Sequence, residues 1–565
     1  MLHRNAGLVR VTALGALAVL LAIAVAACGG GEEEKTPGRT PEASPAAGGT
    51  AAVTATTAAA PKYGGTLHVA DVTDPLHVDA HRSGDSRALT YSSPVTNHLI
   101  RLGVEGKLLP DLADSWEQPD ATTFVLHLHK GVRWQDVPPV NGREFTSADV
   151  KYNIERFTGS PITFIFADIF KGVLKTDGGI ELPDDYTVKF NLTSPNVHFP
   201  YIVAHPALVM VAREQVEAAG DKKLTDSVIG TGPFILTKYS RAVGAEMKKN
   251  PNYWRKDAQG NAMPYLDGIN IAIITDPTAR TVAFKTKQLD TTTVEPTLLK
   301  DLTRDVPDAV VAEVSSGTPL AIRVKTYEKP FDDLRMRKVL QYATNRQEYI
   351  DTMYDGHASP LYGPIPALFG KWALPEADGA KYDLEKAKAL MAEAGYAGGV
   401  KVKCMTTSAI TSFADANVIM KQQLAKVGID VDMEMVSWAE YVMRAYGGQG
   451  GHVIFAYYDL AHPSIDMYFR LRFRTDASGW SSHRWTNPKV DELIDKQREV
   501  TNEEERLEMV HEIQRLIVDE GPYVFILSTK GIYCRWPSVK NYEPRLFEVN
   551  LYGGSWQYES VWLEK

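Results

Sequence analysis

One stretch of the sequence combines a carboxylate with aromatic rings in a way that suits the binding of a charged small molecule. It runs from Phe455 to Phe469 and reads FAYYDLAHPSIDMYF. Its start predicts a strand, which leaves through Asp459 into a turn at His462 and Pro463. A carboxylate ringed by aromatic side chains matches the charge of a cationic amine, and the rings exclude water. A role for Asp459 as a helix cap or turn residue explains the pattern equally well.

The sequence contains none of the common catalytic or metal-binding motifs. It has no Walker A loop, no His-Glu-x-x-His, no Gly-x-Ser-x-Gly and no paired cysteines for zinc. The run Gly447–Gly451 precedes a strand, whereas a phosphate cradle precedes a helix N-terminus. His127 and His129 share one face of a predicted strand without a third ligand nearby, so a solvated face is the better interpretation. We therefore expect that the protein is not an enzyme and binds no cofactor or metal. A hydrolase site assembled from residues that are distant in the sequence is the alternative.

The elements that must position these residues begin with a strand that feeds a helix. Ala321–Thr326 alternates apolar and polar residues, which predicts a strand. In Pro330–Ile350, Asp332 or Asp333 can cap a helix that opens a new lobe. The residues at helical spacing on one face are Met336, Val339, Leu340, Ala343, Gln347 and Ile350.

Strands then alternate with helices of ten to fifteen residues, which predicts a mainly parallel sheet covered by helices. Open sheets of this kind bind ligands at the carboxyl ends of their strands, and Asp459 follows such an end. The predicted strands are Val400–Cys404, Ile429–Met435, Val453–Tyr458 and Tyr523–Leu527, and the predicted helices are Leu384–Ala394, Phe413–Val427, one from Trp438 and two opened by Asn487 and Asn502.

The N-terminal half shows the same kinds of signal. The glycines that flank Thr231 allow a tight turn and a close approach to another surface. The predicted strands are Thr66–Val69, Phe124–Leu128, Asp185–Asn191 and Ile269–Ile274, and the predicted helices are Thr146–Arg156 and Thr278–Lys287.

Length and composition limit the classes of protein. The chain has 565 residues, of which 44% are hydrophobic, so it exceeds one core and should form two or three lobes. Its net charge of -9 argues against a basic surface that binds nucleic acid. Residues 1–27 combine a basic start with an apolar run, which predicts a secretory signal. Residues 28–61 lack periodicity and predict a disordered tether. Apart from Cys28, only Cys404 and Cys534 remain, and their pairing cannot be argued from sequence.

Several motifs resemble one known family. Pro330–Ile350 (PFDDLRMRKVLQYATNRQEYI) and Tyr382–Tyr396 (YDLEKAKALMAEAGY) are similar to the signature of dipeptide- and oligopeptide-binding proteins of ATP-binding cassette importers, bacterial extracellular solute-binding protein family 5. Val25–Cys28 resembles a lipobox, which implies cleavage before Cys28 and acylation of that cysteine; an uncleaved membrane anchor is the alternative. Further similar motifs are Gly64–Val69, Gly230–Phe234, Asn250–Trp254 and Pro264–Asp267.

The resemblance implies an α/β fold of the periplasmic-binding-protein type, a clamshell of two α/β lobes plus an extra domain, discontinuous in sequence. The expected parts are a signal peptide at 1–27, the lipidated cysteine and disordered tether at 28–61, lobe I at 62–105, 228–318 and 525–565, accessory domain II at 106–227, and lobe III at 319–524.

The resemblance also implies roles for particular residues. In the family's peptide-binding members an aspartate four residues before a proline receives the amino terminus of the peptide, and Asp459 stands four before Pro463. Ala456 stands where those members carry tryptophan, and His462 replaces their acidic residue. The expected solute-binding residues are Asp459, Trp438, Tyr457, Tyr458, His462, Trp480 and Trp485.

The implied function is capture of a di- or oligopeptide outside the membrane and its delivery to a permease. The ATPase subunits are then separate chains, because no nucleotide motif appears here. We expect a monomer, anchored by lipid at the outer face of the cytoplasmic membrane. An oligosaccharide binder or a binder of nickel or other metal complexes with the same fold are the alternatives, followed by an extracellular hydrolase.

The anchor yields the first testable prediction. Cys28→Ser removes the only side chain that the lipobox-like motif offers for acylation. We expect the variant to leave the membrane fraction, measured by fractionation and immunoblotting, while Cys404→Ser stays in it. Continued membrane retention of the Cys28 variant would instead indicate an uncleaved anchor.

Overall fold

The computed structural model describes most of the chain after residue 59. The predicted signal peptide, Cys28 and nearly all of the tether lie outside the described residues. No helix in the described part is long and apolar enough to cross a membrane. The described residues are 60–564 except 76, 83–86, 104–106, 160–169, 171, 221–223, 409–410, 448–453, 459–463, 478–482 and 543–555.

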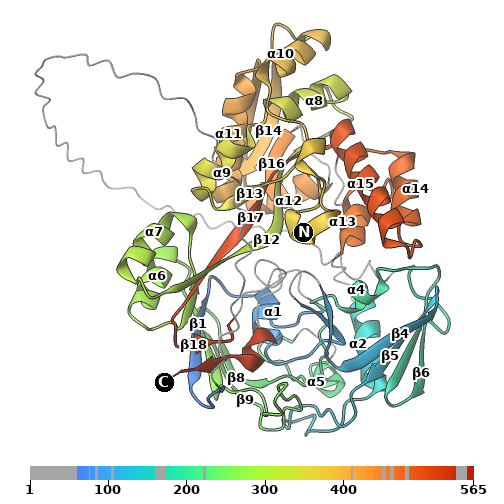
Figure 1. The fold of residues 1–565 in the computed structure, drawn as a ribbon, viewed down its shortest axis with the longest axis vertical. Helices are drawn as coiled ribbons and strands as arrows, with labels where there is room; N and C mark the ends of the chain where they lie inside the picture. The colour runs from blue at the N-terminus through green and yellow to red at the C-terminus, as the bar shows by residue number, and fades with distance from the viewer. Residues whose placement is uncertain are drawn as a thin grey trace, which may run out of the picture. The chain divides into compact units, whose positions relative to one another are not determined.

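A four-stranded sheet gathers the first strand and three strands from the middle of the chain (Figure 1). The strand from Thr66 and the strand near Ile269 form as predicted, and they pair in parallel. The other two pairings are antiparallel. In sheet order the strands are β1 (Thr66–Asp71), β10 (Gly268–Ile273), β9 (Gly244–Lys249) and β8 (Phe234–Ser240).

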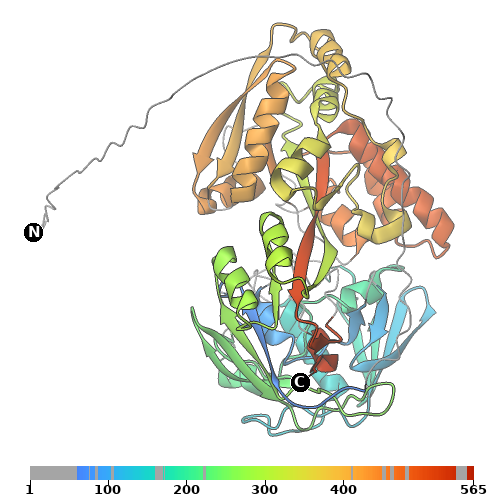
Figure 2. The ribbon, with the colours of Figure 1, turned by 60° about the vertical axis from the view of Figure 1, so that its left-hand side comes forward.

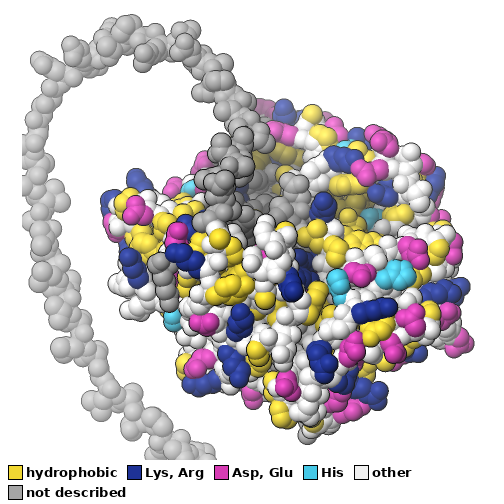
Figure 3. Space-filling view, turned by 60° about the horizontal axis from the view of Figure 1, so that its bottom comes forward, with side chains coloured by type: hydrophobic (Ala, Val, Ile, Leu, Met, Phe, Trp, Pro, Cys, Tyr) yellow, Lys and Arg dark blue, Asp and Glu magenta, His cyan; other side chains and the backbone are white. Residues whose placement is uncertain are grey.

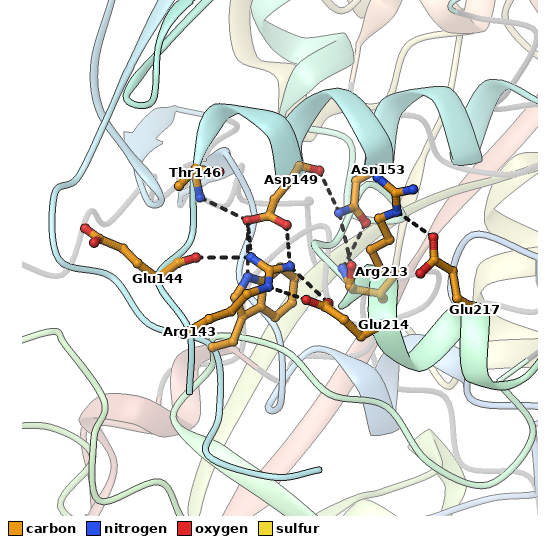
Figure 4. A network of polar contacts seen from close by, with 10 residues as sticks. Arg143, Glu144, Thr146, Asp149, Asn153, Arg213, Glu214 and Glu217 are labelled. Atoms are coloured by element: carbon orange, nitrogen blue, oxygen red, sulfur yellow. Dashed lines mark hydrogen bonds and ion pairs between the residues drawn. The ribbon is translucent and has the colours of Figure 1, made fainter. Parts of the chain in front are cut away.

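A second four-stranded sheet is antiparallel and packs with helix α2 (Ser147–Thr158). The helix starts where the sequence predicts, because the backbone N–H of Thr146 donates to Asp149 at 3.0 Å. Arg143 holds the helix start from below, donating to both oxygens of Asp149 at 2.8 and 2.7 Å and also to Glu214 (Figure 4). In sheet order the strands are β4 (Ala113–Asp120), β5 (Thr123–Leu128), β7 (Thr187–Asn191) and β6 (Ile180–Asp184).

The glycines around Thr231 make the predicted close approach. A Cβ atom on Gly230 would lie 2.3 Å from the carbonyl oxygen of Val95, and one on Gly232 would lie 2.5 Å from its carbonyl carbon. The backbone N–H of Gly232 donates to the same carbonyl oxygen at 2.9 Å. No side chain fits between these two backbones, which explains the glycines.

The largest sheet has seven strands and mixed directions. β14 pairs in parallel with β15 and β16, but every other pairing is antiparallel. The prediction of a mainly parallel sheet is therefore wrong, because β12 brings the chain into this sheet and β17 takes it out beside β12 in the opposite direction. In sheet order the strands are β11 (Thr291–Thr293), β17 (Tyr523–Arg535), β12 (Val310–Val324), β16 (Ile454–Tyr458), β14 (Val400–Thr407) and β15 (Ile429–Val436), with β13 (Ala358–Pro360) also paired to β17.

The helix predicted within Pro330–Ile350 is two helices. Asp333 caps α8 (Leu334–Ala343), and Asn345 then caps α9 (Arg346–Tyr354). Thr344 between them adopts extended backbone angles, which ends the first helix. Gln347 consequently does not share the apolar face and is exposed, whereas the other five predicted face residues are buried.

Three of the remaining helices of this part begin at the predicted caps. Asp383, Asn487 and Asn502 each accept a hydrogen bond from a backbone N–H in the first turn of their helix. They open α10 (Leu384–Glu393), α14 (Pro488–Lys496) and α15 (Glu503–Glu520), and the neighbouring helices are α11 (Thr411–Ala425), α12 (Trp438–Gly447), α13 (Ile465–Arg472), η2 (Ala367–Trp372) and η3 (Glu376–Asp378).

Three large apolar clusters lie behind these sheets. The first unites both four-stranded sheets, the second covers β14, β15 and β16, and a smaller third holds α6, α7 and the ends of β12 and β17. Cys404 and Cys534 are buried in different clusters and are free. The borders of the three expected domains stay a prediction. The elements not yet named are α1 (Arg87–Ser92), β2 (Ile100–Leu102), β3 (Leu108–Pro110), α4 (Phe199–Val203), α5 (Arg213–Ala218), α6 (Pro277–Lys285), α7 (Pro296–Asp305), β18 (Val539–Lys540), η4 (Trp556–Ser560) and β19 (Trp562–Leu563).

A buried carboxylate ties the C-terminal segment to the first cluster. Glu559 on η4 accepts hydrogen bonds from Arg101 and Arg255, both at 2.8 Å, and from the hydroxyl of Tyr253. Burial alone would raise the pKa of Glu559, but the two arginines and the tyrosine lower it to about 2. Glu559 therefore stays ionised in the folded protein at pH values where it is protonated in the unfolded chain.

This lowered pKa predicts a pH-dependent contribution to stability. The contribution is fully present above the ordinary pKa of 4.5 and is lost as the pH falls towards 2. We expect the free energy of unfolding of the wild-type protein to fall by about 3 kcal/mol more over this range than that of Glu559→Gln, measured by urea unfolding. Glu385→Gln, which removes an exposed carboxylate on α10, serves as the control. Equal pH profiles for the wild-type protein and the Glu559 variant contradict the assignment.

Candidate functional site

The predicted binding turn follows strand β16, and the register of the sheet places the end of that strand. Tyr458, the last residue of β16, lies opposite Leu320 of β12. Leu320 also lies opposite Leu527 of β17. The carboxyl end of β16 is therefore level with Leu527, two strands away across the sheet.

The structure describes only some of the predicted site residues. Asp459, His462 and Trp480 lie outside the described residues. Tyr457 and Tyr458 contribute their backbone to β16. The roles of all five in binding a solute stay predictions.

The two predicted tryptophans that the structure describes have different surroundings. Trp438 begins α12 and is 43% exposed, and its ring stacks on Tyr441 with centroids 5.8 Å apart. Trp485 is buried, and its indole N–H donates to Glu520 at 2.9 Å. Trp438 thus has an aromatic face open to other molecules, whereas Trp485 is packed into the protein; whether either residue borders a bound solute stays a prediction.

The exposed face of Trp438 continues a buried aromatic cluster beside β16. Tyr441 lies between Trp438 and Phe455, with ring centroids 6.0 Å apart for Tyr441 and Phe455. Phe413 of α11 packs against the same tyrosine at 5.5 Å. The cluster fixes the start of α12 against the sheet and holds Trp438 in place.

A cavity of about 380 Å³ lies at the carboxyl end of β1, beside β17. Its walls come from β1, α1, α6, β11, the segment before α7, the end of α9 and β17. A molecule of the size of a few amino acids fits such a volume. The residues that matter for its chemistry are Asp71, Arg87, Arg280, Glu295, Tyr354 and Lys530.

Two cationic residues in the cavity wall have well-defined positions. Arg280 is 97% buried, and one of its terminal nitrogens donates to the carbonyl oxygens of Ile274 and Thr275, each at 2.9 Å. Its Nε atom has no hydrogen-bond partner among the described residues. Lys530 projects from β17, with its ammonium 3.7 Å from Glu313. Arg280 also lies 4.0 Å from Glu295. The wall therefore combines positive and negative groups, and its two cations offer charge that suits a carboxylate.

Lys530 in the cavity wall lies beyond the carboxyl end of β16. Strands β16 and β17 run in the same direction, because both are antiparallel to β12. Lys530 is three residues beyond Leu527 along β17, which corresponds to about 10 Å. The two intervening strand spacings add about 10 Å across the sheet. Together these two components place the backbone of Lys530 roughly 14 Å from the end of β16.

Sequence reasoning did not find this cavity. Arg280 lies in a helix that the sequence predicts, but a lone arginine in an amphipathic helix carries no signal for binding. Lys530 lies beyond Leu527, where the sequence predicts the strand to end. The cavity depends on segments more than 200 residues apart, and no local pattern reports such a meeting.

Metal binding finds no support in the part of the chain that the structure describes. No three His, Cys, Asp or Glu side chains are grouped there to hold an ion. His127 faces Glu117 at 3.5 Å and His129 faces Asp114 at 4.0 Å, so the two histidines have separate partners.

Comparisons with known proteins agree with one another. A family model described as bacterial extracellular solute-binding proteins, family 5 Middle, matches residues 107–479. Di/tripeptide-binding protein 2 of Pseudomonas aeruginosa (strain UCBPP-PA14) is 27% identical over 438 residues, which cover 74% of this chain and 80% of that protein.

Solved structures show the same fold. The periplasmic binding protein DppA from Helicobacter pylori, in complex with peptide STSA, has a TM-score of 0.75 and 24% identity, over 89% of this chain and 99% of that one. AgaA from A. tumefacien R10, in complex with agropinic acid, has a TM-score of 0.74 and 25% identity over the same shares. The fold is therefore the α/β clamshell of periplasmic binding proteins, and the chain belongs to the bacterial extracellular solute-binding proteins of family 5.

Proposed function

We propose that this chain is the solute-binding component of an ATP-binding cassette importer and captures a short peptide. The single observation that carries the peptide is the position of Lys530, which lies in the cavity wall and beyond the carboxyl end of β16 by about the length of a short peptide. Di/tripeptide-binding protein 2 and the DppA structure with its peptide support the same class of solute.

In this proposal Asp459 receives the amino terminus of the peptide, and Arg280 with Lys530 attracts its carboxylate. An extended peptide advances by about 3.3–3.6 Å per residue. A span of roughly 14 Å between the two backbones therefore suits three or four residues. The open face of Trp438 offers an apolar surface to a side chain of the peptide.

Closure of the protein around its solute follows from the elements that supply the contacts. Trp438 stacks on Tyr441, which belongs to the second apolar cluster. Arg280 lies on α6, which packs in the third cluster. A solute that contacts both sides favours the state in which they are close. Strands β12 and β17 run between them (Figure 2).

We extend the proposal to the cellular setting. Lipid on Cys28 and the tether at 28–61 would hold a monomeric lobe pair at the outer face of the cytoplasmic membrane, with permease and ATPase subunits as separate chains. Acidic and basic side chains are interspersed over the face shown in Figure 3, which suits an aqueous exterior better than a nucleic acid partner. The absence of catalytic motifs supports binding over turnover.

A small organic acid is the second candidate solute, because AgaA, a protein of the same fold, was solved with agropinic acid. An oligosaccharide or a metal complex is a further alternative. Native mass spectrometry of the chain from Lys62 onward, before and after mild unfolding, separates these classes. Released peptides of three or four residues support the proposal, whereas a single sugar, acid or metal complex contradicts it.

The amine site gives a prediction for affinity. Asp459→Asn removes the charge but keeps the size, so we expect trialanine to bind more weakly by about 1.5–3 kcal/mol, the scale of a hydrogen bond to a charged group. Isothermal titration calorimetry measures the difference. Asp430→Asn on the exposed edge of β15 is the matched control and should bind as the wild type does. Unchanged affinity in the Asp459 variant would contradict the assignment of Asp459 to the amino terminus of the peptide.

The cavity gives a second prediction. Thr293→Trp adds a large ring at the cavity wall, and we expect it to abolish the thermal stabilisation that 100 Kd of trialanine otherwise gives, about 2.7 kcal/mol. Thr286→Trp places the same ring at an exposed position directly after α6, outside the cavity wall, and should keep that stabilisation. Full stabilisation of both variants by trialanine shows that the cavity takes no part in capture.

A further inference from the structure

A chain of buried polar side chains joins the start of α4 to α13 and α14. His198 immediately precedes α4, and its Nε2 atom lies 2.8 Å from Oε1 of Gln497. Gln497 in turn donates to Asp466 of α13 at 2.8 Å. All three side chains are at least 94% buried. Segments nearly 300 residues apart in the sequence therefore share one polar network.

The hydrogen bonds determine which nitrogen of His198 carries its proton. The Nε2 group of Gln497 donates to Asp466 and to the carbonyl oxygen of Ile494, so the Oε1 atom of Gln497 must accept. His198 consequently donates from Nε2 and is satisfied as a neutral ring. Its Nδ1 atom faces the hydroxyl of Ser464 at 3.4 Å.

Backbone and apolar contacts run alongside this network. The N–H of Val197 donates to the carbonyl oxygen of Arg498 at 2.9 Å, and Nε of Arg498 lies 3.3 Å from Asp466. Met467 of α13 packs into the first apolar cluster, whereas its neighbour Phe469 packs into the second. Helix α13 is thus the element through which the two clusters meet at this place.

The network also reaches the start of α13. The helix starts at Ile465. Ser464, which faces His198, is the residue that precedes the helix.

We propose that His198, Gln497 and Asp466 form a latch that holds the segment before α4 against α13 while His198 is neutral, and that protonation of His198 opens it. The latch does not rest on the proposed function.

The charges around His198 set the direction of the pH effect. Burial is the largest influence and lowers the pKa of His198 from 6.5, and Arg506 of α15 and Arg498 after α14 act in the same direction. Asp466 and the hydrogen bond to Gln497 oppose this shift without cancelling it, and the ring of Tyr201 on α4 lies 6.5 Å away. Protonation of His198 is therefore less favourable in the latched state than in the open state. Its stability is fully present above pH 6.5 and is lost progressively as the pH falls below that value.

Hydrogen exchange of the Val197 amide tests the latch without any solute, because this N–H bonds across the contact. In the full chain we expect its protection factor to fall by up to about tenfold between pH 7.5 and pH 5.5, after correction for intrinsic exchange. His198→Gln keeps a donor for Gln497 and removes the titration, so its protection should be the same at both values. Gln497→Leu should lose protection at both.

The controls separate a latch from general destabilisation. His68→Gln changes an exposed histidine on β1 and should reproduce the wild-type pH profile. The amides of β5 report on the core of the first cluster and should keep their protection at both pH values. A wild-type profile equal to that of His198→Gln overturns the proposal, as does a simultaneous loss at Val197 and β5. Failure of peptide binding leaves this readout intact, so the two proposals fail separately.

Discussion

The antiparallel pairing of β12 with β17 is the interaction on which the rest of the structure depends. One end of the pair lies in the third apolar cluster and the other end lies in the second, so the same backbone hydrogen bonds serve both. Between them the register shifts from Ser315 to Pro319, where Gly317 adopts a positive φ of 65° that favours glycine. This irregularity is a point at which the strand pair can change its bend without losing the ladder on either side.

The same strand pair organises the candidate site and its surroundings. It carries Lys530 to the cavity at β1 and carries Leu320 beside the end of β16. The polar contact of His198 with Gln497 lies elsewhere, at α13. The first and second apolar clusters and their neighbours are thus connected at two separated places, by a hydrogen-bonded pair of strands and by a polar contact between side chains. Such a division suits a protein that must both capture and release.

Many local features followed from the sequence because their causes are local. Asp383 and Asn502 cap their helices as predicted, since a short polar side chain needs only the next turn of backbone. The close approach at Gly232 also followed, although its partner, Val95, did not. The single helix predicted through Ala343 was wrong, because a spacing pattern continues across Thr344 even where the backbone turns away.

The sequence by itself determined the family, the helix starts, the close approach of Gly232 and the choice of Asp459 as a candidate, because each depends on neighbouring residues or on a recognisable motif. Only the tertiary structure decided the strand directions of the large sheet, the cavity between Arg280 and Lys530, and the contact of His198 with Gln497. The contact of His198 with Gln497 joins segments about 300 residues apart, and the cavity joins segments still farther apart in the sequence. Their free energy comes from burial and hydrogen bonds across the fold, which leave no periodic trace along the chain.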